Sequence, residues 1–392
     1  MRYFVLLWAL LALPARAQVL ILGRVVDEKG QPVAYASVAL ADGRAGTATN
    51  EVGEFSLRVP PLPRLLTVLS IGYERAEAPA AQPGRLPTDV VLKASAVALP
   101  EVTVRANAEA EELVRRCYAK LLRHQADVQY GRGFYRQKTR ENGRYREFFD
   151  AFYDVKITPR NMPSWALGEA SYALTPGGMT MTNFSSLTRL VSLFQTGPVA
   201  PDKLLVPPRS DASEHFSFVL RQTLREQGRE LAVVDFLPRP GETLAPKGTL
   251  YLDPRTATVA RIEQELPAEV MTLSNPAFHV EKITQRLTTD FVAQNDSLTR
   301  IANTRNVTVI NATANGFADE TVVTSYFLIY EYGAPTPGQQ YRDTGLAVND
   351  LAEIRKRRYH PAFWRDNAVL KDSPVEAQVI EDFEGRRVFG KL

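Results

Sequence analysis

Short apolar segments separated by turn residues run from Ile21 to Val104. Glu54–Val59 alternates apolar and polar side chains, as expected of a half-buried strand, and Leu65–Ile71 is a continuous apolar run typical of a central strand. Asp, Asn and Gly occupy the intervening turns, including Asp27–Gly30. The pattern predicts an N-terminal seven-stranded β-sandwich.

A helical pattern follows over residues 107–124. Asn107 can cap the helix, and its basic residues gather toward the C-terminal end. Cys117, the only cysteine, lies in the apolar stripe with no His or Asp signature beside it, so we expect a buried structural thiol and no disulfide. The stripe comprises Ala110, Leu113, Val114, Cys117, Leu121 and Leu122.

Beyond the helix, the chain reads as successive β-hairpins, which predict a large curved antiparallel sheet, a meander or half-barrel. A capping box, Ser373–Glu376, opens a C-terminal helix. We expect helices near 107–124, 348–358 and 374–384. The paired segments are Phe134–Arg140 with Tyr145–Thr158, Phe216–Arg225 with Glu230–Phe236, Gly248–Leu252 with Thr258–Leu266, and Glu281–Ala293 with Leu298–Ile310, followed by Glu320–Tyr330.

Residues 159–210 interrupt the strand rhythm with seven prolines and four glycines, which include Pro159, Pro207 and Pro208. We interpret them as a long surface excursion packed on the sheet, with a short amphipathic helix at Ser185–Phe194. Long loops often carry function, which is the alternative.

The N-terminus resembles a secretory signal peptide. Arg2 is followed by an apolar run of ten residues, Phe4–Leu13, and Ala15–Ala17 forms a small-x-small cleavage site. We therefore divide the chain into a signal peptide (1–17), the sandwich (18–105) and a larger antiparallel β domain (106–392). No later run approaches 18 apolar residues, so we expect no transmembrane helix and at most peripheral membrane association.

The order of glycines and aromatics in the first region resembles the carboxypeptidase-regulatory-like domain, a transthyretin-like sandwich found in envelope proteins of Bacteroidota. The resemblance implies structural roles for these residues: turn glycines and a core that includes Phe55 and Tyr73. Asp27 and Asn50 could form a calcium pair, but capping of their own turns is the favoured interpretation. The matching residues are Gly23, Val25, Asp27, Gly30, Pro32, Gly46, Thr47, Thr49, Asn50, Gly53, Phe55, Ser70, Gly72, Tyr73, Glu101, Val102 and Val104.

The resemblance does not bring peptidase activity with it. A zinc carboxypeptidase needs a His-x-x-Glu pair, and none of the four histidines has Glu three residues later. His360, among aromatic residues in a tail resembling that of other Bacteroidota envelope proteins, is expected to be packed rather than to act as a base. The histidines are His124, His215, His279 and His360.

Charge and motifs narrow the function further. Without Arg2 and Arg16, 45 basic residues face 44 acidic ones, which gives no electrostatic case for nucleic-acid binding. The basic run Arg355–Arg358 is interpreted as a solvated helix end. The hairpin Lys247–Glu263 resembles that of lipoprotein-carrier half-barrels, which hold apolar ligands in a cavity; an ordinary filled core is the favoured alternative.

These observations predict a non-enzymatic exported protein of the periplasm or outer-membrane face. The sandwich would serve as a docking or spacer module, and the second domain would bind a glycan, peptide, lipid or partner protein. No catalytic, cofactor-binding or metal-ligating residue is predicted. An envelope hydrolase using a carboxylate pair and a small outer-membrane-associated transport component are the alternatives.

Overall fold

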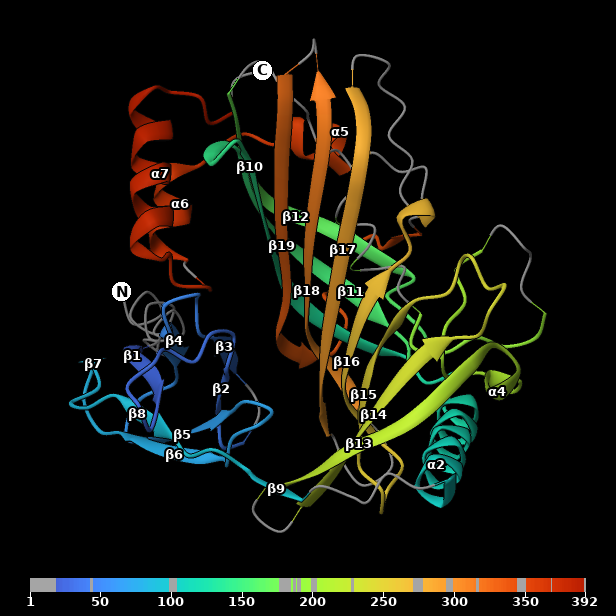
Figure 1. The fold of residues 1–392 in the computed structure, drawn as a ribbon. Helices are drawn as coiled ribbons and strands as arrows, with labels where there is room; N and C mark the ends of the chain where they lie inside the picture. The colour runs from blue at the N-terminus through green and yellow to red at the C-terminus, as the bar shows by residue number, and fades with distance from the viewer. Residues whose placement is uncertain are drawn as a thin grey trace, which may run out of the picture. The chain divides into compact units, whose positions relative to one another are not determined.

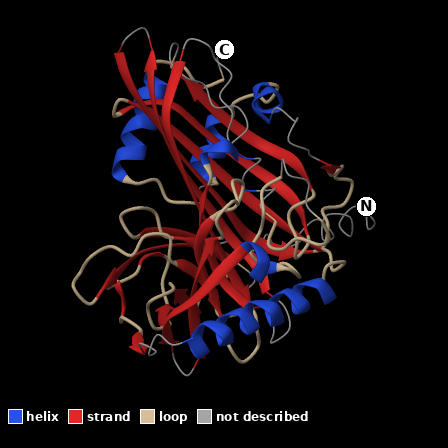
Figure 2. Cartoon of the chain, turned by 45° about the vertical axis from the view of Figure 1, so that its right-hand side comes forward, coloured by secondary structure: helices blue, strands red, loops and turns tan. Residues whose placement is uncertain are grey.

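The computed structural model describes most of the chain, and the described part is mainly β (Figures 1 and 2), which confirms the predicted fold class. The predicted signal peptide lies outside the described residues. The chain separates into two compact units: unit 1 is Met1–Ile71, Arg75–Lys93 and Val369–Lys371, and unit 2 is the remainder. Described are residues 19–42, 45–98, 104–175, 185, 188, 192–198, 203–226, 229–270, 278–293, 299–314, 317–343, 350–367 and 369–390.

Unit 1 contains two four-stranded sheets, each of which buries apolar side chains such as Phe55 and Leu66. The sheets hold eight strands rather than seven. Val104, predicted to end a strand, is instead the first residue of a helix. The first sheet joins β1 (Val19–Asp27) to β4 (Glu54–Val59), β7 (Gly84–Arg85) and β8 (Val90–Leu92); the second runs β3 (Gly46–Ala48), β2 (Ser37–Leu40), β5 (Arg64–Leu69) and β6 (Ala76–Ala80).

At two positions of the first region, close contacts with neighbouring atoms require glycine. A Cβ on Gly23 would lie 2.4 Å from the ring of Phe55, which is fully buried. Gly53 has a φ of +76°, and a Cβ there would lie 2.4 Å from the carbonyl oxygen of Val25. The sequence pattern of this region therefore records packing and turn geometry.

Unit 2 is built on one twelve-stranded antiparallel sheet. Asn142 and Gly143 both have positive φ, as the predicted Asn-Gly hairpin requires. In order across the sheet, the strands are β20 (Arg342–Asp343), β12 (Ser164–Leu174), β11 (Arg144–Ile157), β10 (Gln129–Glu141), β19 (Phe317–Gly333), β18 (Thr299–Ala314), β17 (Phe278–Ala293), β16 (Val259–Leu266), β15 (Lys247–Leu252), β14 (Arg229–Pro238), β13 (Phe216–Glu226) and β9 (Ala96–Ala98).

Strand β12 was not predicted, because its segment follows Pro159 and Pro163 and shows no strict alternation. Of the short helix expected at Ser185–Phe194, only Ser185 and Thr188 are described as helical, and Ser192–Phe194 is not helical. The remaining residues of that segment lie outside the described part.

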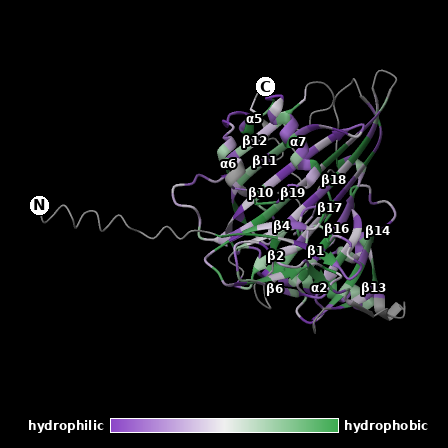
Figure 3. Cartoon of the chain, turned by 90° about the vertical axis from the view of Figure 1, so that its left-hand side faces the viewer, coloured by the Kyte–Doolittle hydropathy of each residue, from purple (hydrophilic) through white to green (hydrophobic). Residues whose placement is uncertain are grey.

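Helix α2 (Val104–Arg123) packs against the β13–β16 part of the sheet (Figure 2). Leu113, Val114 and Cys117 join Phe218, Phe236 and other residues in one buried apolar cluster. We call the sheet face that α2 covers the inner face. The strands alternate green and purple residues along their length in Figure 3, as a sheet with two different faces requires. The other described helices are α4 (Ala212–His215), α5 (Asp350–Arg355), α6 (Pro361–Asp366) and α7 (Pro374–Gly385), with a 3-10 turn at Ala268–Val270.

Helix α7 is held on the outer face by buried ion pairs. Its predicted capping box is present between Ser373 and Glu376. Arg136 of β10 forms two bonds to Asp150 of β11, at 2.8 and 2.7 Å, and lies 2.6 Å from Asp372. Lys138 lies 2.8 Å from Glu376. This ion cluster ties the C-terminal helix to the middle of the sheet.

Candidate functional site

A row of neutral polar side chains crosses the inner face of the sheet, where an ordinary core would hold apolar residues. Strand register places Gln264, Asn306, Ser325 and Gln137 on one line, each within one or two strands of the next. A second line of side chains on the same face lies two residues further along each strand. We call these residues the polar band: Gln137, Thr139, Glu147, Gln264, Gln285, Asn306, Thr308 and Ser325, all at most 5% exposed.

Hydrogen bonds link members of the polar band across neighbouring strands. The amide of Gln285 donates to Asn306 at 3.3 Å, and the amide of Asn306 donates to Thr308 at 3.2 Å. At the other end, Gln137 and Thr139 donate to one carboxylate oxygen of Glu147, at 3.0 and 2.6 Å. These bonds form two separate groups, one of Gln285, Asn306 and Thr308 and one of Gln137, Thr139 and Glu147.

The network leaves some buried atoms without a partner. The Oε1 atom of Gln285 and the Oγ atom of Ser325 are buried and accept or donate no hydrogen bond. Such an atom costs about 1–3 kcal/mol, so native cores rarely keep one without a reason. These two atoms mark the places where the inner face could still bind a hydrogen-bonding group.

Glu147 is the only carboxylate in the polar band, and it is 1% exposed. Burial raises its pKa, while hydrogen bonds from Thr139, Gln137 and Tyr172 oppose that rise. Its neighbours on the inner face are aromatic: Tyr172 donates to it at 3.3 Å, and Phe149 packs against the Tyr172 ring. The band thus passes from neutral amides to a carboxyl group flanked by rings.

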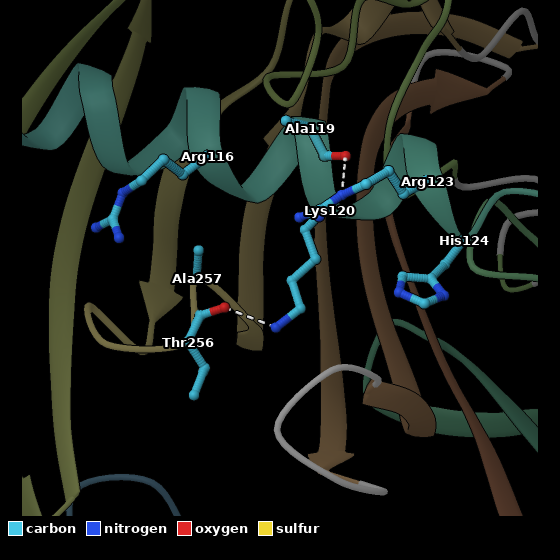
Figure 4. A pocket seen from close by; sticks show the side chains of 7 residues that line it. All are labelled: Arg116, Ala119, Lys120, Arg123, His124, Thr256 and Ala257. Atoms are coloured by element: carbon cyan, nitrogen blue, oxygen red, sulfur yellow. Dashed lines mark hydrogen bonds between the residues drawn. The ribbon is translucent and has the colours of Figure 1, made fainter.

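A second feature is a cationic pocket of about 340 Å³ beside the C-terminal half of α2 (Figure 4). Lys120 donates to the carbonyl of Thr256 at 2.7 Å, and Arg116 donates to that of Pro254 at 3.0 Å, so the β15–β16 turn holds both side chains. The lining residues are Arg116, Ala119, Lys120, Arg123, His124, Thr256 and Ala257.

The two residues considered for calcium cap their own turns. The Oδ1 atom of Asp27 accepts from the backbone N–H groups of Lys29 and Gln31, both at 2.8 Å. The Oδ1 atom of Asn50 accepts from those of Val52 and Glu54. In the described part of the chain, no three His, Cys, Asp or Glu residues gather as a metal would require.

Cys117 is buried in the α2 cluster, where burial raises its pKa to about 12, although Lys120 opposes this. A thiol in this state is a poor nucleophile at neutral pH.

His360 differs from expectation. Its side chain is 49% exposed and lies 3.0 Å from the carboxylate of Glu169. The aromatic residues around it in the sequence face elsewhere: Phe363 and Trp364 both pack on Phe152. The position just before α6 therefore leaves the imidazole at the surface, hydrogen-bonded to Glu169 rather than packed in a core.

The carboxylates that come together in unit 2 are held by cations. Asp150, Asp372 and Glu376 all surround Arg136. Although burial alone would raise it, Arg136 and Lys138 lower the pKa of Glu376 to about 2. A glycosidase needs one carboxyl group that is protonated at working pH; here burial raises the pKa of Asp150 to about 6, although Arg136 opposes this, and all three carboxyl groups contact the Arg136 side chain.

Among the described helices, none is both long enough and apolar enough to cross a bilayer.

No curated protein matches this sequence. Solved structures align over about half of it at low identity. A DUF1329 family protein from Desulfovibrio piger is 11% identical (TM-score 0.23; 56% of this chain, 91% of that chain). An outer membrane lipoprotein-sorting protein domain from Vibrio parahaemolyticus is 13% identical (TM-score 0.22; 63% and 97%). The LolA superfamily protein NE2245 from Nitrosomonas europaea is 8% identical (TM-score 0.20; 60% and 96%). TM-scores this low do not define a shared fold.

The N-terminal region matches a known domain family. Residues 21–104 match the model of the CarboxypepD_reg-like domain family, which confirms the resemblance read from the glycines and aromatics of this segment.

Proposed function

We propose that this chain is a non-enzymatic, exported envelope protein whose second domain binds a hydrogen-bonding ligand on the inner face of its sheet. The N-terminal domain, residues 18–105, serves as a docking or spacer module. The second domain, residues 106–392, carries the binding site. The polar band is the observation on which this proposal rests.

A buried amide with an unpaired oxygen is costly, and replacing it with an apolar residue would relieve that cost. Natural proteins keep such groups mainly at functional sites. The band is therefore the best supported location for binding.

The chemistry of the band favours a glycan or a peptide backbone over an alkyl chain. Amides and hydroxyls both donate and accept, which suits the alternating donors and acceptors of sugars and peptides. An alkyl chain laid on Gln285 and Ser325 would leave their unpaired atoms unsatisfied. Aromatic rings beside the band, such as Tyr172 and Phe149, can stack on sugar faces.

The absence of a catalytic constellation in the described residues supports the non-enzymatic part. Three histidines pair with carboxylates: His124 with Asp127, His215 with Glu242 and His360 with Glu169. In the described contacts, none of these imidazoles touches a serine hydroxyl or a thiol that it could activate.

The test is a thermal-shift measurement on the full chain with neutral oligosaccharides, peptidoglycan-derived muropeptides and phospholipid micelles. A ligand at 100 times its Kd adds about 2.7 kcal/mol to stability, and raises Tm by several degrees. We expect stabilisation by a saccharide or muropeptide, and loss of that shift in Asn306→Leu.

The matched control is Asn303→Leu on the same strand. Asn303 is also buried, at 4%, but register with Leu328 places it on the other face of the sheet. It should keep the shift. If no saccharide or muropeptide raises Tm, or if Asn306→Leu responds like the parent protein, the band does not bind ligand.

A further inference from the structure

The cationic pocket beside α2 is a separate feature that the proposed function does not use. Its lining holds three permanently basic side chains and one histidine, and none of the seven lining residues is acidic. His124 contacts the carboxylate of Asp127 at 2.8 Å, and Arg116 interacts electrostatically with that of Glu112. The pocket is therefore strongly positive in a protein whose overall charge is close to neutral.

The described hydrogen bonds of the arginines in the pocket go to backbone carbonyls, and Arg116 also interacts electrostatically with Glu112. Arg116 donates one hydrogen bond to Pro254, and Arg123 donates one, at 3.4 Å, to Ala119 in its own helix. A guanidinium has five N–H donors, so each arginine keeps donors available to a ligand. The neighbouring Arg115 behaves differently, because both carboxylate oxygens of Glu112 bind it.

Small residues shape the pocket around these cations. Ala119 of α2 and Ala257 of the β15–β16 turn lie between the basic side chains in Figure 4. Ala257 is buried and has a φ of 54°, so the turn that carries Thr256 has a fixed and unusual backbone. Lys120, which also lines the pocket, donates to the carbonyl of Thr256 in that turn.

From this geometry we propose that the pocket binds a phosphoryl group. Three cations that line one pocket suit a multiply charged oxyanion better than a single carboxylate. Arginine offers a planar fork that matches phosphate oxygens, and lysine adds a point charge. In the tautomer that donates from Nδ1 to Asp127, Nε2 of His124 is an acceptor, so the donors for a phosphoryl group come from the arginines and Lys120.

The size of the adjoining space limits the source of that phosphoryl group. An apolar crevice lined by Leu121, Pro159 and Val259 opens beside the pocket, but its volume is only about 10 Å³. On this measure a space of about 10–15 Å³ holds one water molecule, so an acyl chain does not fit. The ligand is either a soluble phosphoryl compound or a lipid headgroup whose chains remain in the membrane.

Basic residues near the end of a helix also favour its dipole, and that alone could account for Lys120 and Arg123. The two explanations differ in what they predict. Dipole compensation makes these side chains contribute to stability without any affinity for phosphate. A phosphoryl site requires saturable binding that depends on the lining residues and weakens with salt.

The experiment is calorimetric titration of the full chain with inorganic pyrophosphate at low salt. We expect saturable binding, weakened about tenfold or more in Arg123→Gln and in Lys120→Gln, as loss of one charge-assisted contact predicts. Arg123→Gln is the safer variant, since its described contact is within α2. Arg115→Gln removes the same charge from the same helix outside the pocket and should change affinity less than about twofold.

A parallel arm measures sedimentation with phosphatidylglycerol vesicles and with phosphatidylcholine vesicles. Binding to pyrophosphate identifies a soluble phosphoryl ligand, whereas binding to phosphatidylglycerol vesicles alone, lost in Arg123→Gln, identifies a lipid headgroup. The proposal is wrong if neither probe binds, or if Arg115→Gln weakens binding as much as Arg123→Gln. Because the polar band lies elsewhere on the sheet, Asn306→Leu should leave this binding unchanged, which separates the two proposals.

Discussion

Replacing Arg136 with methionine tests the role of the buried ion cluster under α7. Methionine keeps most of the packing of the arginine stem while removing its charge. The guanidinium is 6% exposed and lies within 4 Å of three carboxylates, those of Asp150, Asp372 and Glu376. It also lies 5.0 Å from the centre of the Phe148 ring.

Removing one partner of a buried pair leaves an uncompensated charge and costs about 3–5 kcal/mol. In the variant, the three carboxylates would remain without the guanidinium between them. Lys138, at 2.8 Å from Glu376, would still contact one of the three. We therefore expect Arg136→Met to lower the free energy of unfolding of unit 2 by about 3–5 kcal/mol near neutral pH.

Urea unfolding followed by tryptophan fluorescence measures this quantity, because Trp165 and Trp364 both lie in unit 2. The cost should shrink at pH 5. Without Arg136, the pKa values of the neighbouring carboxyl groups rise, so the native variant binds protons that the unfolded chain does not, and its stability increases as the pH falls.

Arg132→Met is the matched control on the same strand and face. Arg132 pairs with Glu331 at 3.1 Å, but both side chains are about half exposed, at 52% and 42%. Exposed pairs contribute about 0–1 kcal/mol. If Arg136→Met costs no more than Arg132→Met, or if its cost does not depend on pH, the ion cluster does not hold α7 in the way we infer.

Three further outcomes follow from the structure. The pKa of Glu376 is lowered from 4.5 to about 2. Its contribution of about 3 kcal/mol to the free energy of unfolding is therefore present above pH 4.5 and is lost as the pH falls toward 2. Acid unfolding of Glu376→Gln should be less steep than that of the parent protein over this range. Gly248→Ala should destabilise by about 1–3 kcal/mol in urea, since its Cβ would lie 1.9 Å from the Glu263 carbonyl oxygen, whereas Gly333→Ala, with no atom within 4 Å, should change stability little. Cys117, buried with a pKa near 12, should react with iodoacetamide only in denaturant, and rapid labelling of the native protein would contradict its placement.

The turns and hairpins could be predicted because their information is local. Asn142–Gly143 needs two positive φ angles, and only residues that tolerate them occur there. The capping box at Ser373 is likewise contained in four consecutive residues. Strand β12 escaped prediction because prolines before it suggested a loop, and its pairing with β11 and β20 is not encoded in its own sequence.

The functional candidates could be predicted less well. Gln264, Gln285, Asn306 and Ser325 are ordinary polar residues within strands, spread over about 60 positions of sequence. The alternation of polar and apolar residues along these strands would, by itself, place these side chains on the solvent-exposed face. Only the strand register shows that they share the buried face with Phe236 and Phe327.

The sequence by itself determined the class of the protein: a CarboxypepD_reg-like domain whose glycines fix its turns, one amphipathic helix, and a series of antiparallel hairpins. Those features depend on residues near one another in the chain. The tertiary structure decided which polar side chains lie together on the inner face, and which cations line one pocket beside α2. Sheet order and strand register set these contacts, and both arise from pairing between segments far apart in sequence.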